Sequence, residues 1–138
     1  MIVLDTNVIS AVVGGEVEET VVAWLDEIAD DAALTSVTAA ELRVGVALLP
    51  PGKRRARLAA KIEGMVLQDF EDAVLPFDER ASRAYAAVVA GRRGQGRAIS
   101  VPDAQIAAIC LSQGASLATR NVRDFDRTGV TVINPWET

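Results

Sequence analysis

The sequence opens with Met1-Ile-Val-Leu-Asp-Thr-Asn7, in which an apolar run meets three polar residues. A continuous apolar run this short is typical of a strand that is buried on both faces of a parallel sheet. The run ends at Asp5, where the chain is expected to leave the sheet. Because open α/β sheets bind ligands beyond the carboxyl ends of their strands, Asp5 is a candidate ligand-binding carboxylate. The alternative interpretation is that Asp5 only caps the helix that follows, since Asp is a preferred N-cap.

Strands and helices are expected to alternate along the rest of the chain. The expected strands are residues 1–4, 33–36, 74–77, 116–119 and 130–133. The expected helices are residues 6–13, 16–31, 37–49, 53–69 and 78–92, and one that begins near Pro102 and is closed by Gly114. This alternation predicts an α/β fold, a three-layer α/β/α sandwich on a mainly parallel central sheet. The sequence contains no internal repeat or linker, so residues 1–138 are expected to form a single domain.

The composition excludes several kinds of active site. The chain has 19 acidic and 14 basic residues, a net charge of −5 and no histidine. Catalysis by Ser-His-Asp or Cys-His groups and histidine-ligated zinc are therefore excluded. The single cysteine, Cys110, lies in an apolar helical pattern, so no disulfide framework or cysteine-based metal site is expected. Without a signal peptide or an apolar run long enough to span a bilayer, the protein is expected to be cytoplasmic, with no membrane partner.

Four acidic residues follow candidate strands, at or just after the start of the next helix. They are Asp5, Glu41, Asp103 and Asp124. Each has an alternative interpretation at a helix start: Thr38-Ala-Ala-Glu41 matches a capping box, and Asp103 would lie in a first turn. In a parallel sheet, however, all such junctions lie at one edge, so the four carboxylates are expected to converge. Crowded carboxylates repel one another. A set of oxygen ligands without His or Cys favours Mg²⁺ or Mn²⁺ over zinc.

Four segments, taken together, resemble the PIN-domain ribonucleases, and among them the VapC toxins of bacterial toxin–antitoxin pairs. The segments are Ile2-Val-Leu-Asp-Thr-Asn7, Thr38-Ala-Ala-Glu-Leu-Arg-Val-Gly45, Pro102-Asp103 with the Ala/Ile-rich helix after it, and Ala118-Thr-Arg-Asn-Val-Arg-Asp-Phe125. Each segment alone is a weak motif. Their order and spacing span essentially the full length, and this makes the resemblance specific.

The resemblance implies a PIN-like fold and a metal-dependent endoribonuclease that hydrolyses RNA phosphodiester bonds. It implies that Asp5 and Asp103 hold Mg²⁺ or Mn²⁺ and that Glu41 completes the acidic pocket. It further implies that three polar residues orient the acids and the water: Thr6, Asn7 and Thr119. The implied partners are the RNA substrate, a second copy of the chain in a homodimer, and a small co-expressed antitoxin of the VapB kind that blocks the pocket.

The fourth acid departs from the family pattern. Many members place an aspartate where this chain has Asn121, whereas Asp124 lies one helical turn further on. An asparagine still offers an oxygen ligand, so both residues are retained as candidates and Asp124 is preferred.

Five arginines are candidates for holding the RNA backbone, because a guanidinium matches the geometry of a phosphate. They are Arg43, Arg92, Arg93, Arg97 and Arg120. The alternative for each is solvated surface or ion pairing with the many acids, and for each residue taken singly this alternative is preferred. The acidic net charge also argues against avid, non-specific RNA binding.

Three other functions compete with this interpretation. A phosphatase of the haloacid dehalogenase type also begins with an apolar strand that ends in Asp, but it needs a second Asp where this chain has Asn7. A catalytically inactive PIN-like scaffold that binds RNA or protein is disfavoured because Asp5, Glu41 and Asp103 are all present. A housekeeping RNA-processing nuclease without an antitoxin is the remaining alternative, and the neighbouring gene would distinguish it from a toxin.

Overall fold

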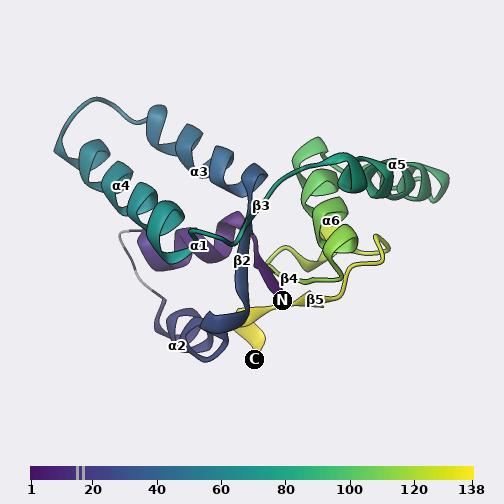
Figure 1. Ribbon diagram of the computed structural model, residues 1–138, viewed down its shortest axis with the longest axis horizontal. Coiled ribbons are helices and arrows are strands. Elements are labelled where there is room, and N and C mark those ends of the chain that lie inside the picture. Colours follow the sequence, from purple (N-terminus) through teal and green to yellow (C-terminus); the bar gives the residue numbers. More distant parts are fainter. Residues whose placement is uncertain (15, 17) are drawn as a thin grey trace.

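The computed structural model describes residues 1–138 except Gly15 and Val17, and it leaves the side chain of Leu67 undescribed. Within these residues five strands form one sheet in the order β3-β2-β1-β4-β5, and every neighbouring pair is parallel (Figure 1). The strands are β1 (Ile2–Leu4), β2 (Ala32–Thr35), β3 (Val74–Leu75), β4 (Ser116–Ala118) and β5 (Val132–Ile133). The predicted α/β architecture on a parallel sheet is therefore confirmed.

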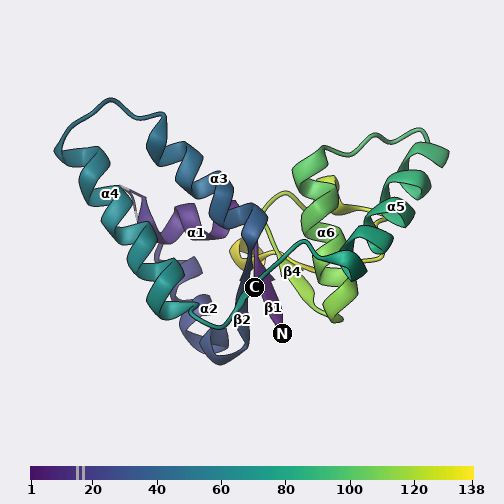
Figure 2. The same cartoon turned by 45° about the horizontal axis from the view of Figure 1, so that its top comes forward.

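Helices cover both faces of this sheet. One face packs against α1 (Thr6–Val13), α2 (Glu19–Ile28), α3 (Ser36–Ala47) and α4 (Lys53–Gly64), and the other against α5 (Glu79–Gly94) and α6 (Val101–Gln113). Figure 2 shows the α3–α4 pair and the α5–α6 pair on opposite sides of the strands. The central strand explains why β1 is apolar throughout: Leu4 packs into the first core and Val3 into the second. Side chains that alternate between two covered faces must all be apolar.

Polar side chains cap the starts of α3, α5 and α6. Asp78 accepts a hydrogen bond from the Ala81 backbone N–H at 3.0 Å, and Ser100 accepts one from Asp103 at 3.3 Å, as the sequence predicted. The interpretation of Thr38-Ala-Ala-Glu41 as a capping box is wrong. Thr35 at the end of β2 is already extended and its hydroxyl accepts the Thr38 N–H at 3.0 Å, so α3 begins at Ser36. Glu41 therefore lies in the second turn of α3, where it has no capping role.

Several element boundaries differ from the predicted ones. The predicted helix 16–31 is α2 followed by a 3₁₀ turn, Ala29–Asp31, and its expected apolar residue Val17 lies outside the described residues, as does the helix-ending Gly15. The predicted helix 53–69 divides into α4 and a π-helical turn, Met65–Asp69. Short 3₁₀ helices cover Val122–Phe125 (η3) and Pro135–Glu137 (η4). No helix in the described part of the chain has both the length and the apolar character that a membrane span requires.

Candidate active site

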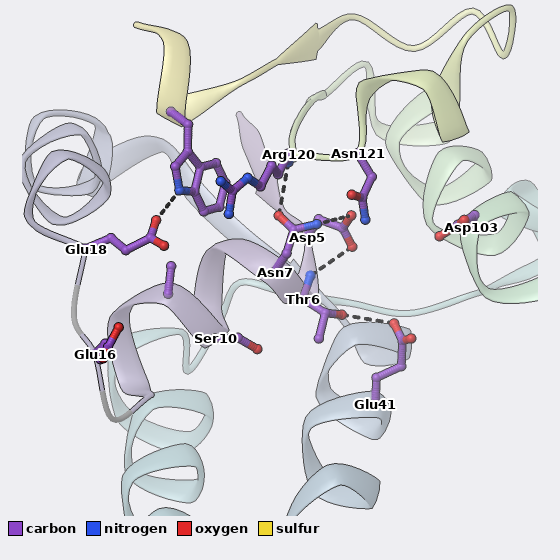
Figure 3. Close-up of a pocket in the computed structure, with 12 residues that line it drawn as sticks. Asp5, Thr6, Asn7, Ser10, Glu16, Glu18, Glu41, Asp103, Arg120 and Asn121 are labelled. Carbon is purple, nitrogen blue, oxygen red and sulfur yellow. Dashed lines mark hydrogen bonds between the residues drawn. The ribbon is translucent and has the colours of Figure 1, made fainter.

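A cavity of about 540 Å³ opens beyond the carboxyl ends of β1 and β4. It contains three of the predicted acids: Asp5 from the end of β1, Glu41 from α3 and Asp103 from the first turn of α6 (Figure 3). The other residues that line it are Thr6, Asn7, Ser10, Ala11, Glu16, Glu18, Arg120, Asn121 and Trp136. The fold brings together carboxylates that lie up to 98 positions apart in the sequence, 5 to 103. Asp5 and Glu41 follow β1 and β2 as predicted, but the prediction that Asp103 follows a strand is wrong, because α6 comes directly after α5 and a loop.

Asp5 is the most buried of these acids, with 5% of its surface exposed. Its Oδ1 accepts the backbone N–H of Thr6 at 2.8 Å, so it does cap α1. Its Oδ2 faces the cavity's polar network and accepts from the Thr119 hydroxyl at 2.7 Å and from Asn7 Nδ2 at 3.3 Å. Burial raises the pKa of Asp5 above its ordinary value, the nearby charge of Asp124 raises it further, and the three hydrogen bonds partly offset this. The capping role and a ligand role are therefore compatible.

Thr119 and Asn7 hold the ends of β1 and β4 together. The buried Thr119 hydroxyl oxygen accepts from Asn7 Nδ2 at 3.1 Å and from the Asn121 backbone N–H at 3.1 Å while it donates to Asp5. Asn7 Oδ1 in turn accepts the Arg120 backbone N–H at 3.1 Å. Three of these hydrogen bonds join the segment after β1 to the segment after β4, and together with the bond from Asn7 they fix the orientation of the Asp5 carboxylate.

Glu41 approaches the cavity from the opposite wall. The Thr6 hydroxyl lies 3.0 Å from Glu41 Oε1, to which it donates, and 3.4 Å from the Thr38 hydroxyl. Thr6 therefore joins the start of α1 to α3 and positions one oxygen of an exposed carboxylate. Within the described residues the second oxygen of Glu41 makes no hydrogen bond, which leaves it available to water.

Asp103 is half-buried on the third side of the cavity. Burial is the main reason that the pKa of Asp103 is raised. A hydrogen bond with Ser100 lowers this pKa in part, and the charges of the acids Asp5, Asp124 and Glu41 raise it further. The acids therefore act on one another electrostatically. Among the described residues no three acidic side chains already form a ligand cluster for a metal. Mg²⁺ is commonly held by one or two carboxylates and completes its shell with water, so the oxygen donors of this cavity fit such an ion.

The two candidates for the fourth acidic position lie differently. Asn121 lines the cavity, whereas Asp124 is exposed on η3 and is not part of the cavity wall. The charge of Asp124 nevertheless raises the pKa of both Asp5 and Asp103. Asn121 thus offers an oxygen in the cavity and Asp124 offers a negative field, and the choice between them stays a prediction.

Arg92 is a correction to the predicted RNA-binding set. Only 4% of its surface is exposed. Its guanidinium donates to four backbone carbonyls, those of Arg97 at 3.0 Å, Ala98 at 3.1 Å, Asp124 at 2.9 Å and Asp126 at 2.8 Å. It therefore ties the end of α5 and the following loop to the segment around η3, and it is not available to a phosphate.

The other four candidate arginines are exposed or partly exposed. Arg43 forms a bidentate ion pair with Glu63 at 2.7 and 3.0 Å, and Arg97 pairs with Asp126 at 2.7 Å, in line with the preferred alternative. Arg93 is exposed and makes no ion pair within the described chain. Arg120 alone of the five lines the cavity.

Sequence reasoning missed Trp136, Glu18, Glu16 and Ser10 as cavity residues. Trp136 is brought to the site by η4, which packs against α2. No motif joins the two ends of the chain, so only the folded structure reveals this contact. An unassigned tryptophan two residues from the end of the sequence is the one signal that invited attention.

We expect that Asp103→Asn raises the melting temperature at pH 7 in the presence of EDTA. Because folding raises the pKa of Asp103, the ionised group destabilises the folded state at any pH above that pKa. The stability advantage of the variant should disappear as the pH falls through the raised pKa and below 3.8, the ordinary value, since the wild-type acid is then neutral as well. Calorimetric melting between pH 3 and 8 measures this.

A matched control is Asp30→Asn, which neutralises an exposed acid of the 3₁₀ turn after α2 and is expected to change the melting temperature little. If Asp103→Asn instead melts below wild type at pH 7, the hydrogen bond with Ser100 outweighs the burial of charge.

Comparisons with known proteins show which family the chain resembles. The model of the PIN domain family matches residues 2–130. The chain is 44% identical over 138 residues to VapC ribonuclease Y4jK of Sinorhizobium fredii, with 99% of each sequence covered. It is 42% identical over 137 residues to toxin FitB of Neisseria gonorrhoeae, again with 99% of each covered.

Solved structures extend the likeness to the fold. The crystal structure of FitAcB from Neisseria gonorrhoeae superposes with a TM-score of 0.93 at 41% identity, over the whole of both chains. VapBC-5 from Mycobacterium tuberculosis, a member of the VapBC family of toxin–antitoxin systems, gives a TM-score of 0.68 at 29% identity and covers 95% of this chain and 94% of its own.

Proposed function

The chain belongs to the PIN-domain family, and from this we propose that it is a metal-dependent endoribonuclease that acts as the toxin of a toxin–antitoxin pair. The relatives named as a VapC ribonuclease and as a toxin support both parts of this proposal. The observation that carries it is the convergence of Asp5, Glu41 and Asp103 on one cavity at the carboxyl ends of the strands.

We assign roles to the cavity residues as follows. Asp5 and Asp103 are the proposed ligands of Mg²⁺ or Mn²⁺, and Glu41 completes the acidic group with Asp124 or Asn121. An ion held there would polarise the phosphoryl group and lower the pKa of a water that it binds. Thr6, Asn7 and Thr119 orient the carboxylates through the hydrogen bonds described above.

Glu41 is suited to handle the proton of the attacking water. Thr6 fixes its Oε1 at 3.0 Å, and its other oxygen is free among the described residues to accept a hydrogen bond from water. A carboxylate within hydrogen-bond reach of the nucleophile is the geometry that general base catalysis requires. The cavity has no histidine to serve instead, because the chain contains none.

The proposed partners are an RNA substrate, a small cognate antitoxin, and a second copy of this chain in a homodimer. The antitoxin is supported by the likeness to FitB and to VapBC-5, whose names record a toxin and a toxin–antitoxin system. We further propose that residues 1–138 act as one domain, which agrees with the length of the family match. Arg93 and Arg120 remain the arginines proposed to contact RNA, because Arg92 is buried and Arg43 and Arg97 are paired.

Incubation of the purified protein with a mixed RNA pool tests this function. We expect cleavage with Mn²⁺ or Mg²⁺, none with EDTA, and recovery when the metal is restored in excess. Expression in a bacterial host should arrest growth, and co-expression of the small reading frame next to the gene should relieve the arrest. RNA binding without cleavage would favour the inactive scaffold, and cleavage without growth arrest would favour a housekeeping nuclease.

A further inference from the structure

Arg120 is the one basic residue among the described residues that line the acidic cavity. Its guanidinium lies over the ring of Trp136, 4.9 Å from the ring centroid. Asp5, Glu16 and Glu18 line the same cavity, yet no ion pair in the described part of the chain includes Arg120. An arginine beside several acids would ordinarily pair with one of them, so its place on the indole ring calls for a physical reason.

Two anchors fix Arg120 in this place. Its backbone N–H donates to Asn7 Oδ1 at 3.1 Å, and Asn7 also contacts Asp5 Oδ2 at 3.3 Å. The backbone of Arg120 and the carboxylate of Asp5 are thus joined through one side chain. The guanidinium is held in turn by the attraction of a cation to the face of an indole ring.

Trp136 is itself fixed. Its indole N–H donates to the carboxylate of Glu18, and its backbone N–H donates to Asn134 Oδ1 at 3.0 Å. The preceding Pro135 is buried, which seats η4 against α2. The carboxylate of Glu18 is therefore occupied by the indole and competes less for the guanidinium. We call Arg120, Trp136 and Glu18 the Arg120 anchor.

The guanidinium of Arg120 is therefore positively charged but does not use its N–H groups for hydrogen bonds within the described residues. The side chain of Arg120 makes no hydrogen bond within the described residues, although a guanidinium carries five N–H donors. Contact through the flat face of the group leaves the N–H edge free for a planar, bidentate partner such as a phosphate. Ordering the group on Trp136 before the ligand arrives reduces the entropy lost when a ligand binds.

We propose that Arg120 binds a backbone phosphate of the RNA, beside the phosphodiester that faces Asp5 and Asp103, and that Trp136 and Glu18 are positioning residues for it. This inference rests on the proposed ribonuclease function. The acids repel an RNA phosphate in the absence of a cation, whereas Arg120 attracts one without any metal. Part of the RNA affinity should therefore persist in EDTA and depend on Arg120.

The test measures binding of a short, labelled single-stranded RNA by fluorescence anisotropy in EDTA, as a function of salt. We expect Arg120→Gln to weaken binding about tenfold and to reduce the salt slope by about 0.7, the value for one phosphate contact on a single strand. Arg120→Lys keeps the charge and should recover most of the slope but only part of the affinity. Arg83→Gln, which removes an exposed arginine paired with Glu79 on α5, is the matched control and should bind as wild type does.

The positioning role has its own variants. Trp136→Leu should weaken RNA binding severalfold, because Arg120 keeps its charge but loses the aromatic ring that holds its guanidinium in place. Trp136→Phe supplies a ring again and should restore most of the lost affinity. Glu18→Ala removes a partly exposed side chain that anchors the indole, so it tests the same role with little risk to the fold. Equal affinity for Trp136→Leu, Glu18→Ala and wild type, with unchanged melting temperatures, would overturn the positioning role.

This experiment separates the inference from the proposed function. An unchanged salt slope in Arg120→Gln, or no RNA binding by wild type in EDTA at low salt, overturns the phosphate contact even if the protein cleaves RNA with Mn²⁺. Conversely, binding that depends on Arg120 in a protein that never cleaves RNA supports the anchor and contradicts the ribonuclease.

Discussion

Asp5→Asn is expected to lower the rate of metal-dependent RNA cleavage at least about 10³-fold while the protein stays folded. A metal ion supplies several kcal/mol of charge stabilisation in the transition state, and each 1.4 kcal/mol corresponds to a factor of about ten in rate. Asparagine keeps the shape of the side chain but withdraws the charge from a site where both carboxylate oxygens are fixed by hydrogen bonds. Single-turnover cleavage of a mapped RNA substrate measures the loss.

The substitution also has a structural cost that a control must separate. Both oxygens of Asp5 only accept hydrogen bonds, from Thr6, Thr119 and Asn7, so the amide group of asparagine has to face at least one donor. Circular dichroism and the melting temperature of the variant must therefore accompany the rate. Cleavage at the wild-type rate by a folded Asp5→Asn protein would remove Asp5 from the catalytic group.

Arg92→Met is expected to destabilise the protein by about 4 kcal/mol or more, the largest effect on folding that we anticipate. Hydrogen bonds to a charged group contribute roughly 1.5–3 kcal/mol each, and Arg92 makes four of them from a buried position, although such contributions do not add fully. The melting temperature should fall by on the order of 10 °C or more. Urea unfolding of the two proteins measures the difference.

The neighbouring Arg93→Met provides the control, because Arg93 is exposed and unpaired among the described residues, and its change should stay within about 0.5 kcal/mol. Loss of RNA affinity by a fully stable Arg92→Met protein would reinstate Arg92 as an RNA contact. Because Arg92 donates to the Asp124 carbonyl within η3 and to the Asp126 carbonyl just after it, its loss should also loosen Asp124 and the nearby Asn121.

The sequence predicted those features that depend on local pattern. The apolar run before Asp5 predicted a strand covered on both faces, and Val3 and Leu4 do pack into separate cores. Asp5 at the end of this run predicted a carboxylate at the ligand-binding edge, because the carboxyl ends of parallel strands all lie at the same edge of the sheet. Asp103 was placed correctly in a first helical turn for the same kind of reason, since Ser100 and Pro102 mark a helix start.

The features that the sequence did not predict depend on contacts between distant segments. Thr35 and Thr38 are both acceptable N-caps, and the end of β2 decides in favour of Thr35. The partners of Arg92 are backbone carbonyls, which leave no trace in the side-chain pattern. Trp136 meets Glu18 across 118 positions, so no local periodicity reports their contact. Such contacts are visible only once the chain is folded.

Calorimetric titration of Mn²⁺ into the purified protein is the most direct test of the carboxylate metal site. We expect binding by wild type and a loss of affinity of at least about tenfold in Asp5→Asn and in Asp103→Asn, because each variant withdraws a ligand from the cavity. The exposed-acid control Asp30→Asn should bind as wild type does. Equal affinity in all four proteins, or cleavage of RNA by a wild-type protein that binds no Mn²⁺ and no Mg²⁺, would contradict the metal-dependent ribonuclease.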